Sequence, residues 1–173
     1  MNQKRSPGDV SNEGVEPCPW NDIFLKRVWR GDVRFTDLDA MGMVNYGTYL
    51  HFVDDAVLTW WQQLPLDFKP SPSEFGIVTV AANCVWMRPV SMRCSLESAI
   101  GVDRIGTKSF QLLCALRKVG DAEPCFAASL TQVYFRDGES TRLDASTRSE
   151  LEKRRLGDCA RDVFYRHLRM GVG

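Results

Sequence analysis

The chain has 173 residues, of which 44% are hydrophobic and 25% charged, and these values are typical of a single globular domain. It carries 22 Lys and Arg residues against 22 Asp and Glu residues, so its zero net charge predicts no nucleic-acid partner. Because no apolar run approaches the roughly 20 residues that cross a bilayer, we expect no membrane partner. No apolar segment follows the early Lys-Arg pair, so a secretory signal is not predicted and we expect a cytoplasmic location.

Six cysteines are spread through the chain without a C-x-x-C pair, and there are only two histidines, His51 and His167. Zinc sites and disulfide frameworks need closely spaced Cys and His residues, so neither is predicted. We interpret the cysteines as small, buried, reduced thiols. The sequence therefore predicts no metal and no cofactor.

The first half of the chain predicts an arm, a strand and a long helix. Residues 1–22 are rich in Ser, Pro, Gly, Asn and Glu, which favours a flexible arm. Residues 24–35, FLKRVWRGDVRF, alternate apolar and charged side chains as a half-buried strand does. From Tyr46 to Leu64 the apolar and aromatic residues recur at steps of three and four, which predicts a mostly buried helix.

The second half predicts four strands and a helical extension. Short turn signals between the strands favour sequential antiparallel pairing. Residues 145–173 are helical in pattern, interrupted at Gly157, and their interleaved charges indicate a solvated face. We therefore predict an α+β domain at residues 23–144, with an antiparallel sheet wrapped around one long central helix and an extra C-terminal helix. The four strand segments are GIVTVAANCVWMRPV, CSLESAIGVDRIG, SFQLLCALRKVG and CFAASLTQVYFRDG.

Two aspartates, Asp37 and Asp39, lie between the first strand and the long helix. A carboxylate near a helix N-terminus gains electrostatic support, and in an apolar pocket it becomes a more reactive base. Gly42 predicts a turn with positive φ, which either lets a ligand approach the backbone or is an ordinary turn, and from the residue alone we favour the ordinary turn. Asp37 either supports Asp39 or bonds to local turn amides, and we favour the turn.

The stretch DLDAMGMVNYGTYLHFVDDA resembles the hotdog-fold acyl-CoA thioesterases, in the branch related to 4-hydroxybenzoyl-CoA thioesterase. The shared pattern is Asp, two residues, Gly, one residue, Val, and then a helix that begins near a Tyr-Leu pair. The downstream segments WMRPV and VDRIGTKS are also similar, and the resemblance runs from Val28 to Asp144. It implies hydrolysis of an acyl-CoA or acyl-carrier-protein thioester by a homodimer or homotetramer whose site lies between subunits.

The resemblance also implies roles for individual residues. Asp39 acts on the thioester carbonyl as nucleophile or general base, the backbone N–H of Tyr46 holds the thioester oxygen, and Gly42 forms the catalytic turn. A related branch takes its carboxylate from the helix, which makes Asp55 a reserve acid. The positions expected to contact substrate are Met43, Asn45, Tyr49 and Arg88.

Several alternatives remain open at this point. Dehydratases of this fold normally carry a histidine near their acid, and because none lies between Asp37 and Asn45, the sequence argues against dehydration. His51 is interpreted as structural. Of the adjacent Trp60 and Trp61, one is expected in the core and the other at an interface.

The sequence also leaves two alternatives for the role of three cations and two for the function of the protein. Arg88, Arg93 and Lys108 either meet coenzyme A phosphates or are solvated surface charges. Many relatives carry histidine where this chain has Met43. That departure motivates an alternative function, an inactive hotdog module that binds acyl-CoA or an acyl-carrier protein.

Overall fold

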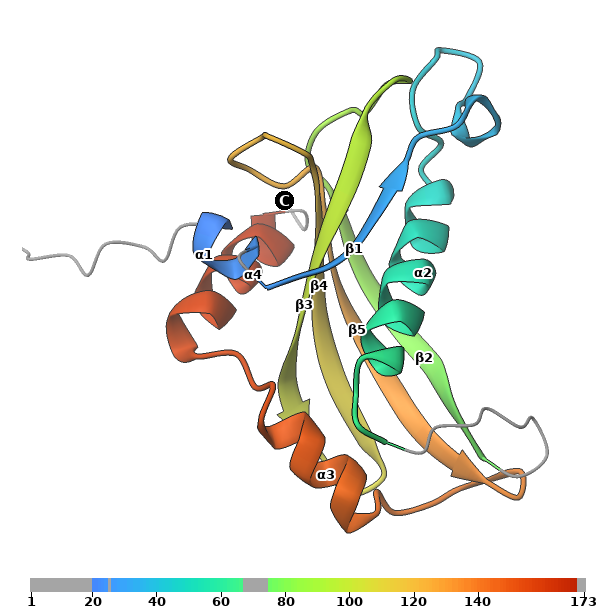
Figure 1. Cartoon of the computed structure of the whole chain (residues 1–173), viewed down its shortest axis with the longest axis vertical. Helices are drawn as coiled ribbons and strands as arrows, with labels where there is room; N and C mark the ends of the chain where they lie inside the picture. Colours follow the sequence, from blue (N-terminus) through green and yellow to red (C-terminus); the bar gives the residue numbers. More distant parts are fainter. Residues whose placement is uncertain (1–19, 25, 67–74, 171–173) are drawn as a thin grey trace, which may run out of the picture.

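The structure is a computed structural model that describes residues 20–24, 26–66 and 75–170. Its core is an antiparallel sheet with helices on both faces (Figure 1). The elements in chain order are α1 (Trp20–Phe24), β1 (Arg27–Asp32), the 3-10 helix η1 (Phe35–Asp37), α2 (Thr48–Gln62), β2 (Phe75–Trp86), β3 (Ser95–Ile105), β4 (Ser109–Lys118), β5 (Phe126–Arg136), β6 (Glu139–Ser140), α3 (Ala145–Glu152) and α4 (Asp158–Met170).

The strands lie in the order β1-β3-β4-β5-β2, with β6 beside β5. Sequential pairing is confirmed for β3, β4 and β5, but it is wrong for β2, which pairs with β5 rather than β3. The connection after β2 contains Pro89, which cannot donate a ladder hydrogen bond, and the amides of Met87 and Arg88 both turn to the Cys125 carbonyl. A tight hairpin between β2 and β3 therefore does not form.

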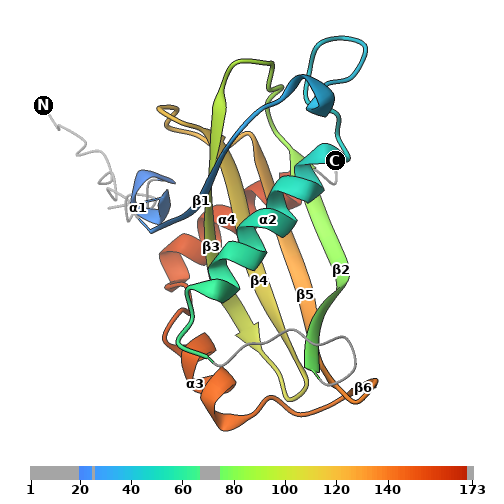
Figure 2. The ribbon, with the colours of Figure 1, turned by 45° about the vertical axis from the view of Figure 1, so that its right-hand side comes forward.

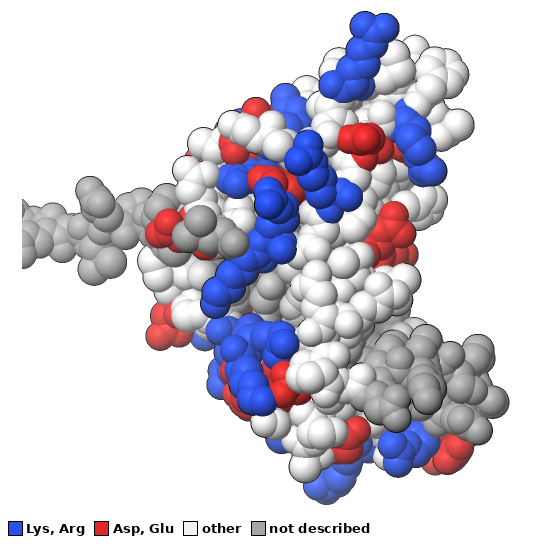
Figure 3. All heavy atoms as spheres, in the orientation of Figure 1, with Lys and Arg blue, Asp and Glu red and all other residues white. Residues whose placement is uncertain are grey.

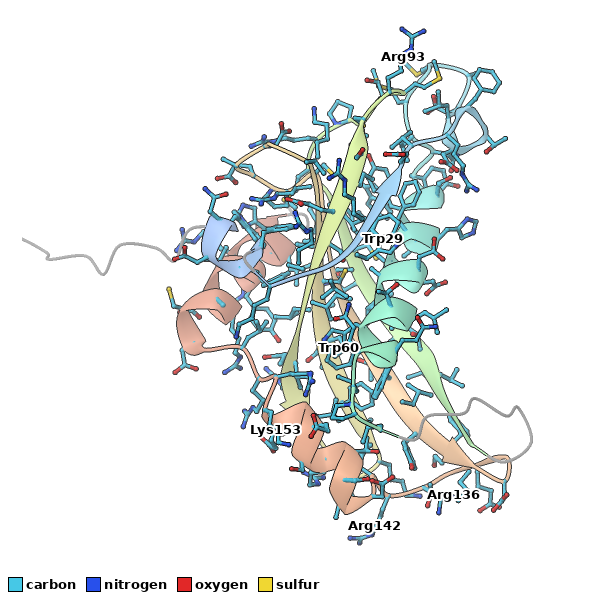
Figure 4. The ribbon with its side chains drawn as sticks, in the orientation of Figure 1. Trp29, Trp60, Arg93, Arg136, Arg142 and Lys153 are labelled. Carbon is cyan, nitrogen blue, oxygen red and sulfur yellow. The ribbon has the colours of Figure 1, made fainter. Side chains whose placement is uncertain are left out.

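Helix α2 lies across one face of the sheet, which we call the inner face (Figure 2). The predicted helix is confirmed, but only one side of it is buried, because Leu50 and Leu58 are exposed. Trp60 points from α2 toward the sheet (Figure 4). Trp61 is equally buried, at 3% exposure, and donates its indole N–H to Gln132. The expectation that one tryptophan faces an interface is therefore wrong for this chain, because the apolar stripe is wide enough to bury both.

Helices α1 and α4 lie against the opposite face of the sheet, the outer face (Figures 1 and 2). The predicted break of the C-terminal segment at Gly157 is confirmed. The prediction of a solvated face for this segment is incomplete, because α4 also has a buried side that packs Phe164 and Leu168 against Trp20 of α1 and the sheet. Residues 20–22, which we expected in a flexible arm, instead start α1, and residues 1–19 lie outside the described part of the chain.

The outer face also contains two buried carboxylates. Glu97 accepts hydrogen bonds from Arg27 at 3.0 Å and Arg117 at 2.6 Å. Burial would raise the pKa of Glu97, but the two guanidinium groups outweigh burial and hold it below its usual value. Asp103 has no exposed surface and accepts from Arg161 at 2.6 Å and from the Tyr165 hydroxyl, both on α4. These contacts tie α4 to β3.

The thiols follow the sequence expectation only in part. Cys114 and Cys125 are buried and reduced, and burial raises the pKa of Cys125 to about 12. Cys84 and Cys94 are partly buried. The expectation is wrong for Cys159, which is exposed, because it lies at the first turn of α4 away from the sheet, while Cys18 falls outside the described residues.

Within the described ranges, no helix combines the length and the apolar character that crossing a membrane requires. Basic side chains gather over α3 and along β1 and β3, with acidic side chains among them (Figure 3). On α3, Glu150 pairs with both Lys153 and Arg154. Paired charges of this kind fit a solvated face rather than a polyanion-binding surface.

Candidate active site

The loop between β1 and α2 begins with a turn that Asp37 closes. The Asp37 carboxylate accepts the backbone N–H of Arg34 at 2.7 Å and its guanidinium at 3.1 Å. Asp37 is only 3% exposed. The turn interpretation of Asp37 is confirmed, and its carboxylate is occupied by Arg34 rather than by Asp39.

Asp39 lies in a small hairpin that follows this turn. The Asp39 amide donates to the Met43 carbonyl at 2.7 Å, and the Asn45 amide donates to the Asp37 carbonyl at 2.9 Å. Oxygen Oδ1 of Asp39 accepts the amides of Met41 and Met43 at 2.8 and 3.1 Å. No described donor contacts Oδ2, and the side chain is exposed. One carboxylate oxygen is therefore held in place while the other is open.

Gly42 lies at the tip of the hairpin with a φ of +75°. A Cβ built at this position would meet no atom within 4 Å. The predicted positive φ is confirmed, and backbone conformation rather than crowding within this chain explains the glycine. Met43 follows it and is 38% exposed.

Asn45 organises the backbone just before α2. Oδ1 of Asn45 accepts the Gly47 amide at 2.9 Å, and the Asn45 carbonyl accepts the Thr48 amide at 2.9 Å. The Tyr46 amide donates to no acceptor within the described residues. Asn45 therefore shapes the helix start, and Tyr46 presents an unpaired N–H there, where the helix dipole favours negative charge.

Trp86, at the end of β2, supports Tyr46 from outside the loop. Its indole N–H donates to the Tyr46 carbonyl at 3.1 Å, and the two rings meet edge to face with centroids 6.4 Å apart. We assigned Trp86 no role from the sequence. No local sequence pattern indicates this contact, because it joins residues that are 40 positions apart.

Other predicted site residues lie elsewhere. Tyr49 is 3% exposed and stacks on Phe126 with ring centroids 5.2 Å apart. Burial raises the pKa of Tyr49 well above its usual value. Tyr49 therefore fills the core beneath the loop, and its contact with substrate stays a prediction.

Asp55 is exposed about two turns into α2. Asp55 acts on the loop through Arg34. The pKa of Arg34 is raised mainly by Asp37 and more weakly by the charge of Asp55. Its neighbour Asp54 is also exposed, and burial raises the pKa of Asp54, an effect that His51 opposes. None of these groups accepts a backbone amide of the Asp39 hairpin.

The three candidate phosphate ligands are separated in the structure. Arg88 is exposed two residues beyond Trp86, the residue that contacts Tyr46. Arg93 lies at the tip of the connection between β2 and β3 (Figure 4). Lys108 donates to the Ser140 carbonyl at 2.8 Å, so it is engaged in holding β6.

Residues 33–153 match the family model described as the thioesterase-like superfamily. The chain belongs to this superfamily. As a member it is a thioester hydrolase. The matched segment contains the Asp39 hairpin and α3, whose Leu151 is fully buried in the same apolar core as the α2 side chains, but it contains neither α1 nor α4.

Solved structures share the fold of this superfamily member. The PA5185 protein from Pseudomonas aeruginosa strain PAO1 is 27% identical with a TM-score of 0.67, covering 74% of this chain and 90% of its own. A thioesterase from Thermus thermophilus, solved with coenzyme A and Zn, is 20% identical with a TM-score of 0.64, covering 72% and 90%. The BH1999 gentisyl-coenzyme A thioesterase is 20% identical with a TM-score of 0.63, covering 71% and 98%.

These structures confirm the predicted hotdog fold, an antiparallel sheet curled around one long helix. A search of curated protein sequences found no significant match.

Proposed function

We propose that this thioesterase hydrolyses an acyl-CoA or acyl-carrier-protein thioester to a carboxylic acid and a thiol, with Asp39 and the Tyr46 amide as its reacting groups. The observation that carries the proposal is one short loop that presents both an open carboxylate oxygen and an unpaired amide. The CoA complex of the Thermus thermophilus thioesterase supports the substrate class. A cytoplasmic location stays a prediction from the sequence.

Asp39 supplies the basic oxygen in this proposal. Two amides hold Oδ1, so Oδ2 faces the substrate. As a general base, Oδ2 takes a proton from water while the water oxygen attacks the carbonyl, and the thiolate then leaves and takes a proton. As a nucleophile, Oδ2 attacks the carbonyl directly and expels the thiolate, and water then hydrolyses the resulting anhydride. The products are the same by either route.

The Tyr46 amide supplies the oxyanion site. Negative charge develops on the carbonyl oxygen during attack, and a fixed N–H at a helix start stabilises it without reorganisation. The bond from Trp86 to the Tyr46 carbonyl fixes the backbone of this residue from the other side. Gly42 lets the hairpin turn tightly enough to bring the two reacting groups to one end of α2.

We propose that the working assembly is a homodimer formed through β2. This strand is one of the two edge strands of the sheet, opposite β1, and its Val78 and Val80 are 49% and 54% exposed. Exposed apolar edge strands invite pairing, and a two-fold axis closes such a contact. Sedimentation is expected to show a dimer for wild type and a monomer for Val80→Lys, whereas a Val80→Lys dimer of wild-type stability would exclude this interface.

The test of the function is thiol release from a panel of aromatic, short-chain and long-chain acyl-CoA and acyl-carrier-protein thioesters. We expect saturable turnover with at least one of them, and the best substrate identifies the acyl group. Turnover that is no faster than buffer across the whole panel would contradict the proposal.

A second candidate is an inactive binding module. Met43 replaces the histidine of many relatives and is exposed beside Asp39, which favours this candidate. Binding of acyl-CoA by equilibrium dialysis together with absent turnover would establish the module. The open Oδ2 and the unpaired Tyr46 amide favour the enzyme.

A further inference from the structure

A cavity of about 260 Å³ opens at the edge of the sheet that lies opposite β2. Three parts of the chain form it, namely the start of β1, the end of α2, and the connection between α3 and α4. Trp60 reaches the cavity from α2, and Lys153 reaches it from the end of α3 (Figure 4). The cavity therefore lies at the C-terminal end of α2, whereas the Asp39 hairpin precedes the N-terminal end of this helix.

The cavity is a gap between two segments that cover the edge of β3. Strand β1 pairs with β3 only as far as Ala99. The connection between α3 and α4 then takes over at Val102, whose N–H donates to the Arg154 carbonyl at 3.0 Å and whose carbonyl accepts the Leu156 N–H at 2.9 Å. Ile100 lies between the two segments and lines the cavity. Backbone hydrogen bonds therefore hold the chain in place on both flanks of the cavity.

One wall of the cavity is apolar and fixed. Val28, Trp60 and Ile100 supply this wall, and they pack in the core of the inner face, where Trp60 is only 3% exposed. Gln63, which follows α2, donates its side-chain N–H to the Val28 carbonyl at 3.2 Å and so ties the helix end to β1. Such a wall favours a ligand with a hydrocarbon body, because its burial releases water from apolar surface.

The rim of the cavity is basic. Two acids of α3, Glu150 and Glu152, pair with three of its four cations, and neither acid lines the cavity. The fourth cation, Lys26, makes no ion pair or hydrogen bond with a described residue. Four cations against two acids leave an excess of positive charge, which favours an anionic ligand. The four cations are Lys26, Lys153, Arg154 and Arg155.

Most of the cavity is built by parts of the chain outside the family-matched segment. That segment spans residues 33–153, so Lys26 and Val28 precede it and residues 154–156 follow it. The cavity is also at the edge opposite β2, through which we propose dimerisation, so it stays accessible in that dimer. A ligand bound here would therefore use residues beyond the family-matched segment, away from the proposed hydrolysis.

We propose that this cavity binds a small amphipathic anion, with its head group on the basic rim and its apolar body against Trp60 and Ile100. Charge-assisted hydrogen bonds from Lys and Arg suit a carboxylate or a phosphate, and the two head groups share this chemistry. The volume is below the range of about 300–1,000 Å³ of pockets for drug-sized ligands, which limits the body to a short chain or a single ring. The site goes beyond the proposed hydrolysis and does not depend on it.

The experiment titrates the full chain with probes that share one hydrocarbon body, namely hexanoate, hexyl phosphate, hexanol and hexylamine. We expect saturable binding of the two anions with a Kd on the order of 1 mM, and binding of the alcohol and the amine at least about tenfold weaker. Acetate lacks the apolar body and should also bind at least about tenfold more weakly than hexanoate. The ratio of the Kd values for hexanoate and hexyl phosphate identifies the preferred head group.

Two tryptophans report where the probe binds. The indole N–H signal of Trp60 in NMR spectra is expected to shift as hexanoate is added, because Trp60 lines the cavity. The indole signal of Trp86 is expected to stay unchanged, because its N–H donates to the Tyr46 carbonyl in the candidate active site. A shift at Trp86 without one at Trp60 would place the anion in the candidate active site and overturn the proposal.

Variants near β1 separate a built site from general attraction of charge. Lys26→Gln removes the unpaired cation and is expected to weaken hexanoate binding about threefold. Arg30→Gln is the matched control, because Arg30 is an exposed cation of β1 that does not line the cavity, and no change is expected. Adding Arg155→Gln to Lys26→Gln should bring the loss to about tenfold, since Glu152 then also loses its partner.

Three results overturn the proposal. Equal weakening by Lys26→Gln and Arg30→Gln would mean non-specific attraction, hexanol binding as tight as that of hexanoate would remove the role of the rim, and absent binding of both anions would remove the site. Thiol release does not enter this experiment. A protein without hydrolase activity that binds hexanoate in this way supports the site, and an active enzyme that binds neither anion overturns the site alone.

Discussion

The two faces of the sheet are covered in different ways. On the inner face, α2 packs aromatic and aliphatic side chains against the strands, and the contact is almost entirely apolar. On the outer face, α1 and α4 add a smaller apolar cluster, and two buried carboxylates, Glu97 and Asp103, are each held by arginine. Helix α2, which covers the inner face, lies in the family-matched segment. Helices α1 and α4, which we call the outer cover, lie outside that segment.

The family-matched fold and the added helices α1 and α4 are therefore stabilised by different forces. Burial of apolar area is tolerant of small shifts, because it is not directional. A buried ion pair tolerates little, because loss of one partner leaves a charge without solvation. The outer cover should therefore respond sharply to single polar changes that leave the inner face unaffected.

The largest expected effect is at Asp103. Asp103→Ala leaves Arg161 and Tyr165 without their buried acceptor, and we expect it to lower the free energy of unfolding by about 3 kcal/mol. Urea unfolding measures this change. The matched control is Asp158→Ala, which removes the 96% exposed partner of the same Arg161 and should cost under about 0.5 kcal/mol. Equal effects of the two substitutions would show that the buried pair does not hold α4.

A smaller loss is expected where the chain crosses the outer face after α3. At Gly101, a Cβ would overlap the side chain of Leu156. Gly101→Ala should therefore cost about 1–3 kcal/mol of unfolding free energy. Leu156→Ala makes room, so a double-mutant cycle should be strongly non-additive. Additive costs in thermal unfolding would mean that Leu156 does not lie over Gly101.

The smallest stability effect concerns the inner face at the start of α3. Asp144 caps this helix through the Thr147 amide at 2.7 Å and accepts the Tyr134 hydroxyl at 2.6 Å. Burial alone would raise the pKa of Asp144, but bonds from Ser146, Thr147 and Tyr134 lower it to about 2. Asp144→Ala should cost about 1 kcal/mol at neutral pH.

The pH dependence of that cost has a definite sign. The unfolded pKa of an aspartate is about 3.9, above the folded value, so the carboxylate contributes fully above that pH and its contribution is lost as the pH falls toward 2. Wild type should therefore lose more stability than Asp144→Ala between pH 5 and pH 2 in urea titrations. Parallel curves would contradict the low folded pKa.

The sequence predicted features whose parts are close along the chain. The helical repeat of α2 follows from local spacing, and so does the turn at Gly42 between Asp39 and Tyr46. Features that join distant segments could not be predicted from one sequence. Trp86 reaches Tyr46 across 40 positions, and Arg161 reaches Asp103 across 58.

Two errors have the same origin. The pairing of β2 with β5 depends on a crossover that local turn signals do not encode. Trp20 was assigned to a flexible arm because its neighbours are polar, but the partners that bury it lie on α4. Burial of an isolated aromatic residue is decided by tertiary contacts rather than by local composition.

The role of Asp39 as the reacting carboxylate is tested most directly by comparing Asp39→Asn with Asp55→Asn in thiol release from the best acyl-CoA substrate. Both variants replace one exposed carboxylate by an amide of the same size, and at position 39 the amide oxygen can still accept the Met41 and Met43 amides. We expect Asp39→Asn to lose at least about a hundredfold in kcat, while Asp55→Asn stays within about threefold of wild type. An active Asp39→Asn enzyme, or a collapse confined to Asp55→Asn, would contradict this role.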